Sequence, residues 1–437
     1  MVLAGTSSAF SQQAGNRPYE YFIRFEHLSV NDGLSQSTGR DILQDNKGFI
    51  WIATQDGLNK YDGQHLTVYK HHSDDTNTVA DNFILCLYED HRGHLWIGTN
   101  GAGISCFDPE KNHFRHFRHD PSNPHTLSNN LVHDIFEDRS GVVWAATEDG
   151  LNRFDAQAES FQRMPLNGIS WAPAYISCIY EDSKARFWLG TAGAGLLEYD
   201  REKATVVRQF IHQSGKNSIG GDYLEAILED HRGDLWIAGP GCPLTRWDET
   251  TGSFTVFSHQ PSDPGSISDN VIYSLYETDV GQPVLWIGTQ RNGLERFVWE
   301  TESFIHYRND PDDPFSLANN IIFSMHASDD GTMWLGTGGG GVSKFSLRGS
   351  MFHTFRNPRG QPANFVWSLL ARDSTQVIIG TQNSGIYIFD RQSQVFTPYP
   401  FDRDQPEASC SYDIYALHRH SDGALWIGTS NHGLYRI

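Results

Sequence analysis

The sequence predicts an all-β fold, a single β-propeller of nine four-stranded blades that spans residues 20–437. Composition gives the first indication, because 41 glycines, 12 tryptophans, 26 phenylalanines and 17 tyrosines favour short strands joined by tight turns. A recurring tryptophan motif gives the second, and the constant spacing of that motif gives the third. Together they indicate one repeat architecture that takes up nearly the whole chain.

The repeat is a tryptophan followed by three small or β-branched residues, as in Trp96-Ile-Gly-Thr. Nine copies, 44 to 50 residues apart, begin at Trp51, Trp96, Trp144, Trp188, Trp236, Trp286, Trp334, Ile378 and Trp426. This period is the length of a four-stranded propeller blade. Because the tryptophans recur at a fixed place, we expect them to fill the space between adjacent sheets and not to bind a ligand.

Each repeat divides into four strands, as residues 84–117 illustrate. An apolar run that ends in acid, Ile84 to Asp90, predicts the first strand, and a turn with Asp and Gly follows it. The tryptophan strand comes next, and after a second turn the third strand ends at Phe107-Asp108. Two apolar residues three apart, Phe114 and Phe117, mark the fourth strand.

The two ends of the chain predict how the ring closes. The fourth-strand pattern already appears at Phe22 and Phe25, ahead of the first tryptophan, whereas the chain ends at Ile437 after the ninth third strand. Pairing the N-terminal strand with the last blade would complete nine blades and leave no exposed edge. The alternative is a seven-bladed ring followed by a two-blade fragment of a second propeller.

Charge and targeting signals restrict the partners. A net charge of −20 with scattered Lys and Arg argues against nucleic acid and against anionic lipid. Residues 1–19 are either a disordered tail or a signal-peptide remnant, because Leu3 to Gln13 read like the end of a secretory signal. No segment approaches 18 apolar residues, so no membrane span is expected in this chain.

A ligand site is expected where the sequence differs from repeat to repeat, in the loops expected at the mouth of the central channel. Aromatic rings with polar tips beside an arginine suit the apolar face and the hydroxyls of a sugar. The candidate ligand-binding residues are Arg40, Asn82, Asn100, Trp171, Tyr175, Tyr223, Arg291, Asn383 and Tyr412.

No catalytic, metal or cofactor site is predicted. Glu-Asp pairs such as Glu89-Asp90 resemble paired catalytic carboxylates, but they recur in successive repeats, which indicates a structural role in the turns. The clustered histidines lack a third ligand at metal spacing.

The segment from Glu89 to Asp108, with its acidic turn, Trp-Ile-Gly-Thr and Phe-Asp, resembles the two-component regulator propeller repeat. The resemblance covers about residues 20–437. Departures are local: Ile378 replaces Trp, Ala185 replaces the turn Gly, and the loops at Asp279 to Pro283 and Gly239 to Pro243 are unusual. That family more often builds sevenfold rings.

The resemblance implies the periplasmic sensor region of a hybrid two-component histidine kinase or related receptor, many of which sense oligosaccharides. The expected function is therefore non-catalytic recognition of a carbohydrate-type ligand, with a partner domain or a second copy receiving the signal. Two alternatives stay open, a propeller enzyme of the lyase or glycoside-cleaving kind and a ligand-free interaction scaffold.

Overall fold

The computed structural model describes residues 23–169, 175–348, 365–382, 384–391, 395–399, 413–430 and 432–437. Apart from one short 3-10 turn, η2 (Val30–Asp32), every regular element in these ranges is a β-strand. Contacts divide the chain into two units, one formed by Ile23–Gly349 and one that holds the strands after Ser350. The predicted all-β class is confirmed for the described residues.

The unit Ile23–Gly349 contains seven four-stranded antiparallel sheets, the blades, numbered 1 to 7 along the chain. Blade 1 comprises β2 (Gly39–Gln44), β3 (Ile50–Thr54), β4 (Gly57–Tyr61) and β5 (Leu66–Tyr69). Blade 2 comprises β6 (Ile84–Glu89), β7 (Leu95–Thr99), β8 (Ile104–Asp108) and β9 (His113–Phe117). Blade 3 comprises β10 (Val132–Glu137), β11 (Val143–Thr147), β12 (Gly150–Asp155) and β13 (Ser160–Met164). Blade 4 comprises β14 (Ile176–Glu181), β15 (Phe187–Thr191), β16 (Leu196–Asp200) and β17 (Thr205–Phe210).

Blade 5 comprises β18 (Ala226–Glu229), β19 (Leu235–Gly239), β20 (Cys242–Asp248) and β21 (Ser253–Val256). Blade 6 comprises β22 (Ile272–Thr278), β23 (Val284–Thr289), β24 (Leu294–Val298) and β25 (Ser303–Tyr307). Blade 7 comprises β26 (Ile322–Ala327), β27 (Thr332–Thr337), β28 (Val342–Ser346) and, from the start of the unit, β1 (Glu26–Leu28).

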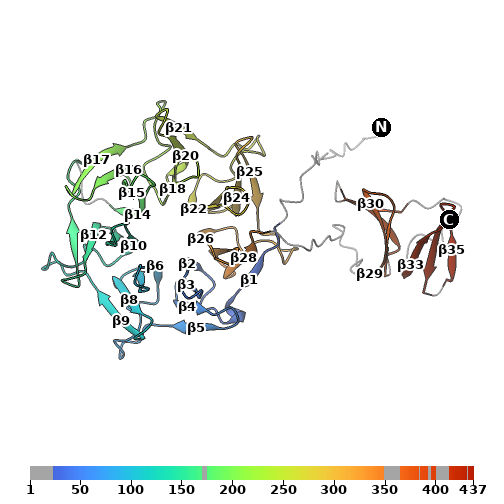
Figure 1. Ribbon diagram of the computed structural model, residues 1–437, viewed down its shortest axis with the longest axis horizontal. Coiled ribbons are helices and arrows are strands. Elements are labelled where there is room, and N and C mark those ends of the chain that lie inside the picture. The colour runs from blue at the N-terminus through green and yellow to red at the C-terminus, as the bar shows by residue number, and fades with distance from the viewer. Residues whose placement is uncertain are drawn as a thin grey trace, which may run out of the picture. The chain divides into compact units, whose positions relative to one another are not determined.

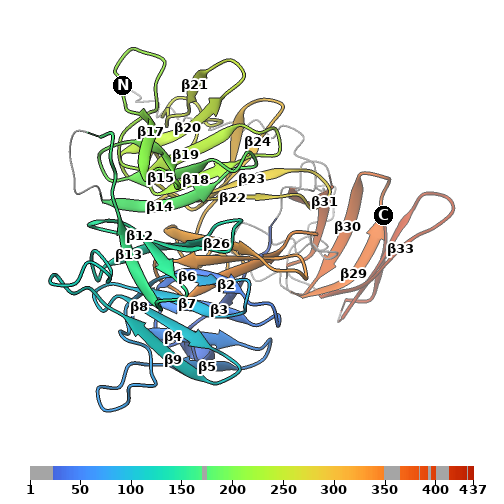
Figure 2. The same ribbon diagram turned by 60° about the vertical axis from the view of Figure 1, so that its left-hand side comes forward.

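The seven blades form a closed ring (Figure 1). The first strand of each blade is innermost and contacts the first strand of the next, from β2 onward to β26 and back to β2. The turned view shows blades 1 and 2 side by side, with β2 and β6 on the inner side (Figure 2). β1 pairs with β28, with Leu28 opposite Val342, so the two ends of the unit share blade 7.

The predicted pairing of the N-terminal strand with the last blade is therefore wrong, and the blade count of nine is not confirmed. The ring closes after seven repeats because β1 occupies the fourth-strand place in repeat seven. Phe352 and Phe355, which repeat the apolar pair of a fourth strand after the seventh tryptophan, lie outside the described residues, as does the predicted tail at residues 1–19. The observed ring matches the seven-bladed alternative.

A hydrophobic cluster fills each interface between neighbouring blades. Trp51 of blade 1 is 1% exposed and packs with Ile84 and Phe107 of blade 2. The same arrangement recurs around the ring. At the closure, Trp334 of blade 7 packs with Ile52 of blade 1. The core role predicted for the tryptophans is thus confirmed for the seven in the ring.

The second unit holds two further sheets with the same strand pattern. One comprises β29 (Val366–Ala371), β30 (Gln376–Thr381), β31 (Ile386–Asp390) and β32 (Phe396–Pro398). The other comprises β33 (Ile414–Arg419), β34 (Leu425–Thr429) and β35 (Leu434–Arg436). Ile378, which replaces the tryptophan, is buried between them with Ile414 and Ile427. On β29, Trp367 and Leu369 are exposed, unlike the core positions of the ring.

Candidate functional site at the ring axis

A register shift on the first strand of a blade turns one side chain toward the axis of the ring. In six of the seven blades, pairing with the second strand skips one residue, as between Gly39 and Asp41 in blade 1. A bulge of this kind re-aims the side chain that it carries. The skipped residues, together with Glu225 at the equivalent place before β18, are Arg40, Leu85, His133, Ser177, Glu225, Tyr273 and Phe323. We call them the axial residues.

Interactions across the ring bring several axial side chains together. The Arg40 guanidinium of blade 1 lies 4.2 Å from the centre of the Phe323 ring of blade 7. The Phe323 ring lies 5.2 Å from that of Tyr273 in blade 6. Arg40 also interacts electrostatically with Glu225 of blade 5. Because blades 1 and 5 are not neighbours, Arg40 and Glu225 approach each other across the centre of the ring.

Arg40 and Glu225 are groups of opposite charge whose side-chain polar atoms have no hydrogen-bond partner among the described residues. Arg40 forms no hydrogen bond or ion pair with the described residues, and its Nε atom is buried. Burial lowers the pKa of Arg40 from its usual value of 12.5, although Glu225 acts in the opposite direction. Burial also raises the pKa of Glu225 to about 7, and Arg40 offsets part of this effect. Near neutral pH the site therefore holds one cation facing a carboxyl group that can gain or lose a proton.

His133 and Tyr175 form a second polar element beside Arg40. Their rings stack with centres 4.4 Å apart, and the Tyr175 hydroxyl lies 3.2 Å from His133 Nδ1. Burial, with a smaller contribution from Arg40, lowers the pKa of His133 to about 4, so the imidazole is neutral at pH 7. Burial raises the pKa of Tyr175, which keeps its proton and can donate it to Nδ1. His133 Nε2 is a buried atom without a hydrogen-bond partner in the described structure.

Two further carboxylates lie one residue beyond axial positions and link neighbouring blades. Asp41 accepts a hydrogen bond from the Leu87 backbone N–H at 2.8 Å, and Asp134 accepts one from Ile179 at 2.8 Å. Burial raises the pKa of Asp41 to about 6 and that of Asp134 to about 7. The centre of the ring thus contains three carboxyl groups with raised pKa values and one arginine.

The structure brings only part of the predicted site together. Arg40 and Tyr175 lie at the axis and interact electrostatically. Tyr223, which precedes Glu225, is 55% exposed. The other predicted residues are exposed on second loops, Asn100 and Arg291, or lie outside the described residues, Trp171, Asn383 and Tyr412.

Asn82 stabilises the loop between the fourth strand of blade 1 and the first strand of blade 2. Its Oδ1 accepts a hydrogen bond from the backbone N–H of His71 at 2.7 Å. Asn130, Asn270 and Asn320 make the same contact in their own blades, each at 2.7 Å. The recurrence of this asparagine reflects a local backbone requirement of the loop between the fourth and first strands.

His133, Glu225 and Tyr273 were missed from the sequence, because the search was confined to loops and these residues belong to the inner strands or directly precede them. A usable signal was present. The axial position changes from blade to blade among charged, polar, aromatic and aliphatic residues, whereas the residue before it is glycine or aliphatic in each of the seven blades.

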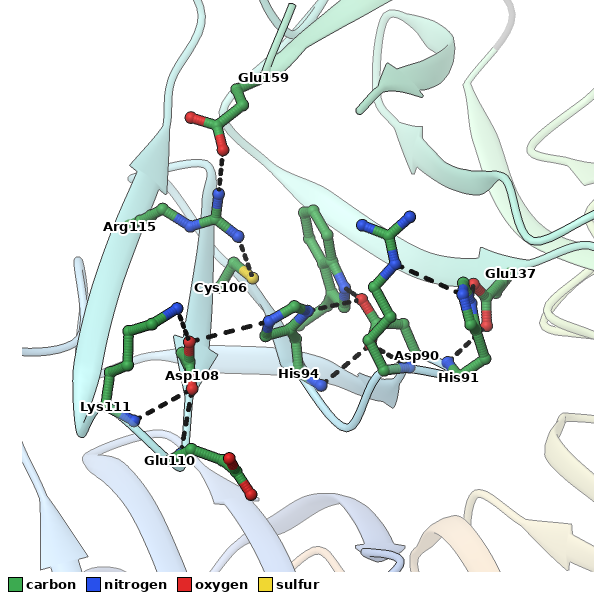
Figure 3. A network of polar contacts seen from close by, with 12 residues as sticks. Asp90, His91, His94, Cys106, Asp108, Glu110, Lys111, Arg115, Glu137 and Glu159 are labelled. Atoms are coloured by element: carbon green, nitrogen blue, oxygen red, sulfur yellow. Dashed lines mark hydrogen bonds and ion pairs between the residues drawn. The ribbon is translucent and has the colours of Figure 1, made fainter. Parts of the chain in front are cut away.

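The repeated Glu-Asp pairs stabilise the turns and the contacts between blades. The two oxygens of Asp90 accept hydrogen bonds from two backbone N–H groups of its turn and from Trp96 Nε1, the last at 2.9 Å. Glu137 of blade 3 accepts hydrogen bonds from the backbone and the imidazole of His91 in the blade 2 turn (Figure 3). Glu89, Glu181, Glu229 and Glu277 each accept from the preceding blade in the same way. These carboxylates therefore serve the architecture, as their recurrence predicted.

Within the described ranges, no group of three or more His, Cys, Asp or Glu side chains is arranged to hold a metal ion. The same ranges contain no helix that is both long and apolar enough to cross a membrane.

Comparison with solved structures agrees with the fold. The extracellular domain of a putative hybrid two component system from B. thetaiotaomicron superposes with a TM-score of 0.77 at 23% identity, over 95% of this chain and 53% of that one. PorZ, a surface component of the type-IX secretion system of Porphyromonas gingivalis, gives a TM-score of 0.55 at 16% identity, over 93% of this chain and 59% of its own. The chain thus spans little more than half the length of these structures.

Sequence comparison identifies the repeat. A histidine kinase, P4, of Formosa agariphila is 41% identical over 56 residues, which are 13% of this chain and 4% of the kinase. The family model of the two component regulator propeller matches residues 78–101, 126–149, 316–339 and 409–431. Each match contains the turn and tryptophan strand that hold a blade together. Four of the repeats are thus two component regulator propeller repeats, as the tryptophan motif predicted.

Proposed function

We propose that this chain is the ligand-sensing part of a bacterial two-component signalling receptor outside the cytoplasm, and that its ligand binds at the axial residues. The observation that carries the proposal is the Arg40 guanidinium facing the Glu225 carboxyl across the ring, with neither group hydrogen-bonded to the described residues. Half-buried charged groups that lack hydrogen-bond partners in the protein can bind a polar ligand, so a pair of this kind at the centre of a ring is a place for one.

A carbohydrate fits the chemistry of this site. A sugar ring offers an apolar face to aromatic side chains, and its hydroxyls both donate and accept hydrogen bonds. Phe323 and Tyr273 supply aromatic rings, and Arg40 and Glu225 supply a donor and an acceptor. The signal then passes to a partner domain or to a second copy of the chain through contacts made by the rigid ring.

An enzyme is the second candidate, because Glu225 and Asp134 both have pKa values raised to about 7 by burial, the range of a general acid or base. Binding without catalysis is favoured, since Asp134 is already engaged by the backbone N–H of Ile179.

A thermal-shift screen against polysaccharide-derived oligosaccharides, with product analysis of the same samples, tests the proposal. A ligand that binds only the folded ring raises its melting temperature. Arg40→Ala is expected to abolish the shift, and Arg153→Ala, which removes an exposed arginine from β12, is expected to preserve it. Product formation would favour an enzyme, and no response to any sugar would favour an interaction scaffold.

A further inference from the structure

A free hydrogen-bond donor at the axis is the Arg40 guanidinium. Arg40 forms no hydrogen bond or ion pair with the described residues, and its side chain is half-buried, although its Nε atom is fully buried. His133 Nε2 also has no partner among the described residues, but this atom is buried and therefore closed to a ligand. A planar guanidinium matches the paired oxygens of a carboxylate better than a single neutral hydroxyl.

Arg40 also supplies the only positive charge at this place. No other lysine or arginine occurs in the seven inner strands, all of which the structure describes. The charged or titratable groups around Glu225 are Arg40, Asp134, Tyr175 and Cys178, and Asp41 lies beside Arg40. With every carboxyl group ionised, the centre of the ring would be negative and would repel an anion. Protonation of a carboxyl group removes that repulsion.

We propose that the ligand carries a carboxylate, that Arg40 donates hydrogen bonds to this group, and that Glu225 takes up a proton from solvent when the ligand binds. This inference rests on the proposed function and narrows its ligand to an acidic one. Glu225 is the group that changes because its carboxyl accepts no hydrogen bond from the described residues, whereas Asp41 and Asp134 are each held by a backbone N–H.

Proton uptake makes a quantitative prediction. With the pKa of free Glu225 near 7, about nine tenths of the molecules have lost the Glu225 proton at pH 8, and about one tenth at pH 6. A ligand that requires the protonated form should therefore bind about tenfold more weakly at pH 8 than at pH 6. Glu225→Gln, which mimics the protonated carboxyl, should bind about tenfold more tightly than the natural chain at pH 8 and should show little dependence on pH.

The test uses the full chain with D-glucuronate as probe, D-glucose as its neutral counterpart and acetate as an acid without sugar hydroxyls, all at matched ionic strength. Affinities come from thermal shift and calorimetry at pH 6 and pH 8. Calorimetry in two buffers of different ionisation enthalpy counts the protons taken up, and we expect close to one at pH 8 and close to none at pH 6. Urea unfolding of each variant establishes that it folds.

The inference is supported if Arg40→Ala abolishes glucuronate binding and Arg153→Ala preserves it. It also requires that Glu225→Gln binds glucuronate with nearly the same affinity at pH 6 and pH 8. Equal binding of acetate also supports it and assigns the ligand to simple carboxylic acids. Glucose binding that equals glucuronate binding overturns the inference but leaves the proposed sensor function intact. No Arg40-dependent binding of glucuronate at pH 6, or no proton uptake by the natural chain at pH 8, also overturns it, while the oligosaccharide screen still tests the sensor function independently.

Discussion

Closure of the ring through β1 can be tested by Phe25→Ala. Phe25 is 2% exposed, and its ring lies 5.3 Å from that of Phe345 and 6.2 Å from that of Tyr307. It belongs to the cluster that joins blades 6 and 7. Removing a buried phenylalanine side chain costs about 3 to 5 kcal/mol. Because β1 is short and lies beside one end of the unit, part of the site can collapse, and we expect about 3 kcal/mol.

Urea unfolding followed by tryptophan fluorescence and far-UV circular dichroism measures this loss. With an m value of about 3 kcal/mol per molar urea, a loss of about 3 kcal/mol lowers the midpoint of the ring by about 1 M. The two units should unfold in separate transitions, and Phe25→Ala should move only that of the ring. The matched control is Phe389→Ala, which removes a buried ring from the second unit and should move only the other transition.

A single transition shifted equally by both variants would refute closure after seven blades, because it would mean that all nine repeats share one cooperative core. A loss below about 1 kcal/mol in Phe25→Ala would refute the burial argument.

Three further predictions concern the blades themselves. Asp90→Ala removes the acceptor of Trp96 Nε1 and of two backbone N–H groups. We expect urea unfolding to show a loss of about 3 to 5 kcal/mol in the free energy of unfolding, and a loss below about 1 kcal/mol would contradict this role. Burial raises the pKa of Asp134 to about 7, so the folded chain keeps a proton that the unfolded chain releases near pH 3.8, and stability declines as pH rises between these values. Asp134→Asn should make the free energy of unfolding depend less on pH, by up to about 4 kcal/mol over this range. If the stability of the variant falls with pH as steeply as that of the natural chain, Asp134 is not the group responsible. Gly98→Ala would place a Cβ atom 2.4 Å from Cys86 Sγ and should lower the free energy of unfolding by about 1 to 3 kcal/mol. Cys86→Ala should restore part of this stability in a double-mutant cycle, and no coupling between the two changes would disprove the clash.

The blade was predictable from the sequence because its determinants are local and repeated. A turn aspartate six residues before a tryptophan recurs at Asp45, Asp90, Asp138, Asp182 and Asp230, and each carboxylate accepts from the indole N–H that follows it. Such a constraint acts within one hairpin, so it leaves the same signature in each of these repeats.

The number of blades was not predictable in the same way, because closure depends on one pairing between distant segments. The stretch around Phe25 can complete any repeat that lacks an outermost strand, and both repeat seven and repeat nine are candidates. Only the packing of Trp334 against the first blade and the pairing of Leu28 with Val342 select repeat seven. The hydrophobic pattern is the same for either choice, so counting strands could not decide between them.

The candidate site was only half predictable for a related reason. Arg40 and Tyr175 stood out because they break the repeat near a loop. Glu225 and His133 lie at strand positions, and strand alternation alone does not indicate that a bulge turns them to the axis.

The inner strands separate the residues that build a blade from those that are free to vary. Cys86 packs over Gly98 on the neighbouring strand, and no larger residue fits at that glycine. Where the inner residue is instead Asp134, its cross-strand partner is Ala146, and the carboxylate reaches the next blade. The axial position just before this pair has no such cross-strand partner, because the register skips it. Each blade can therefore present a different side chain to the centre of the ring without disturbing its own packing, and this freedom allows a repeated structure to hold a site made of unlike residues.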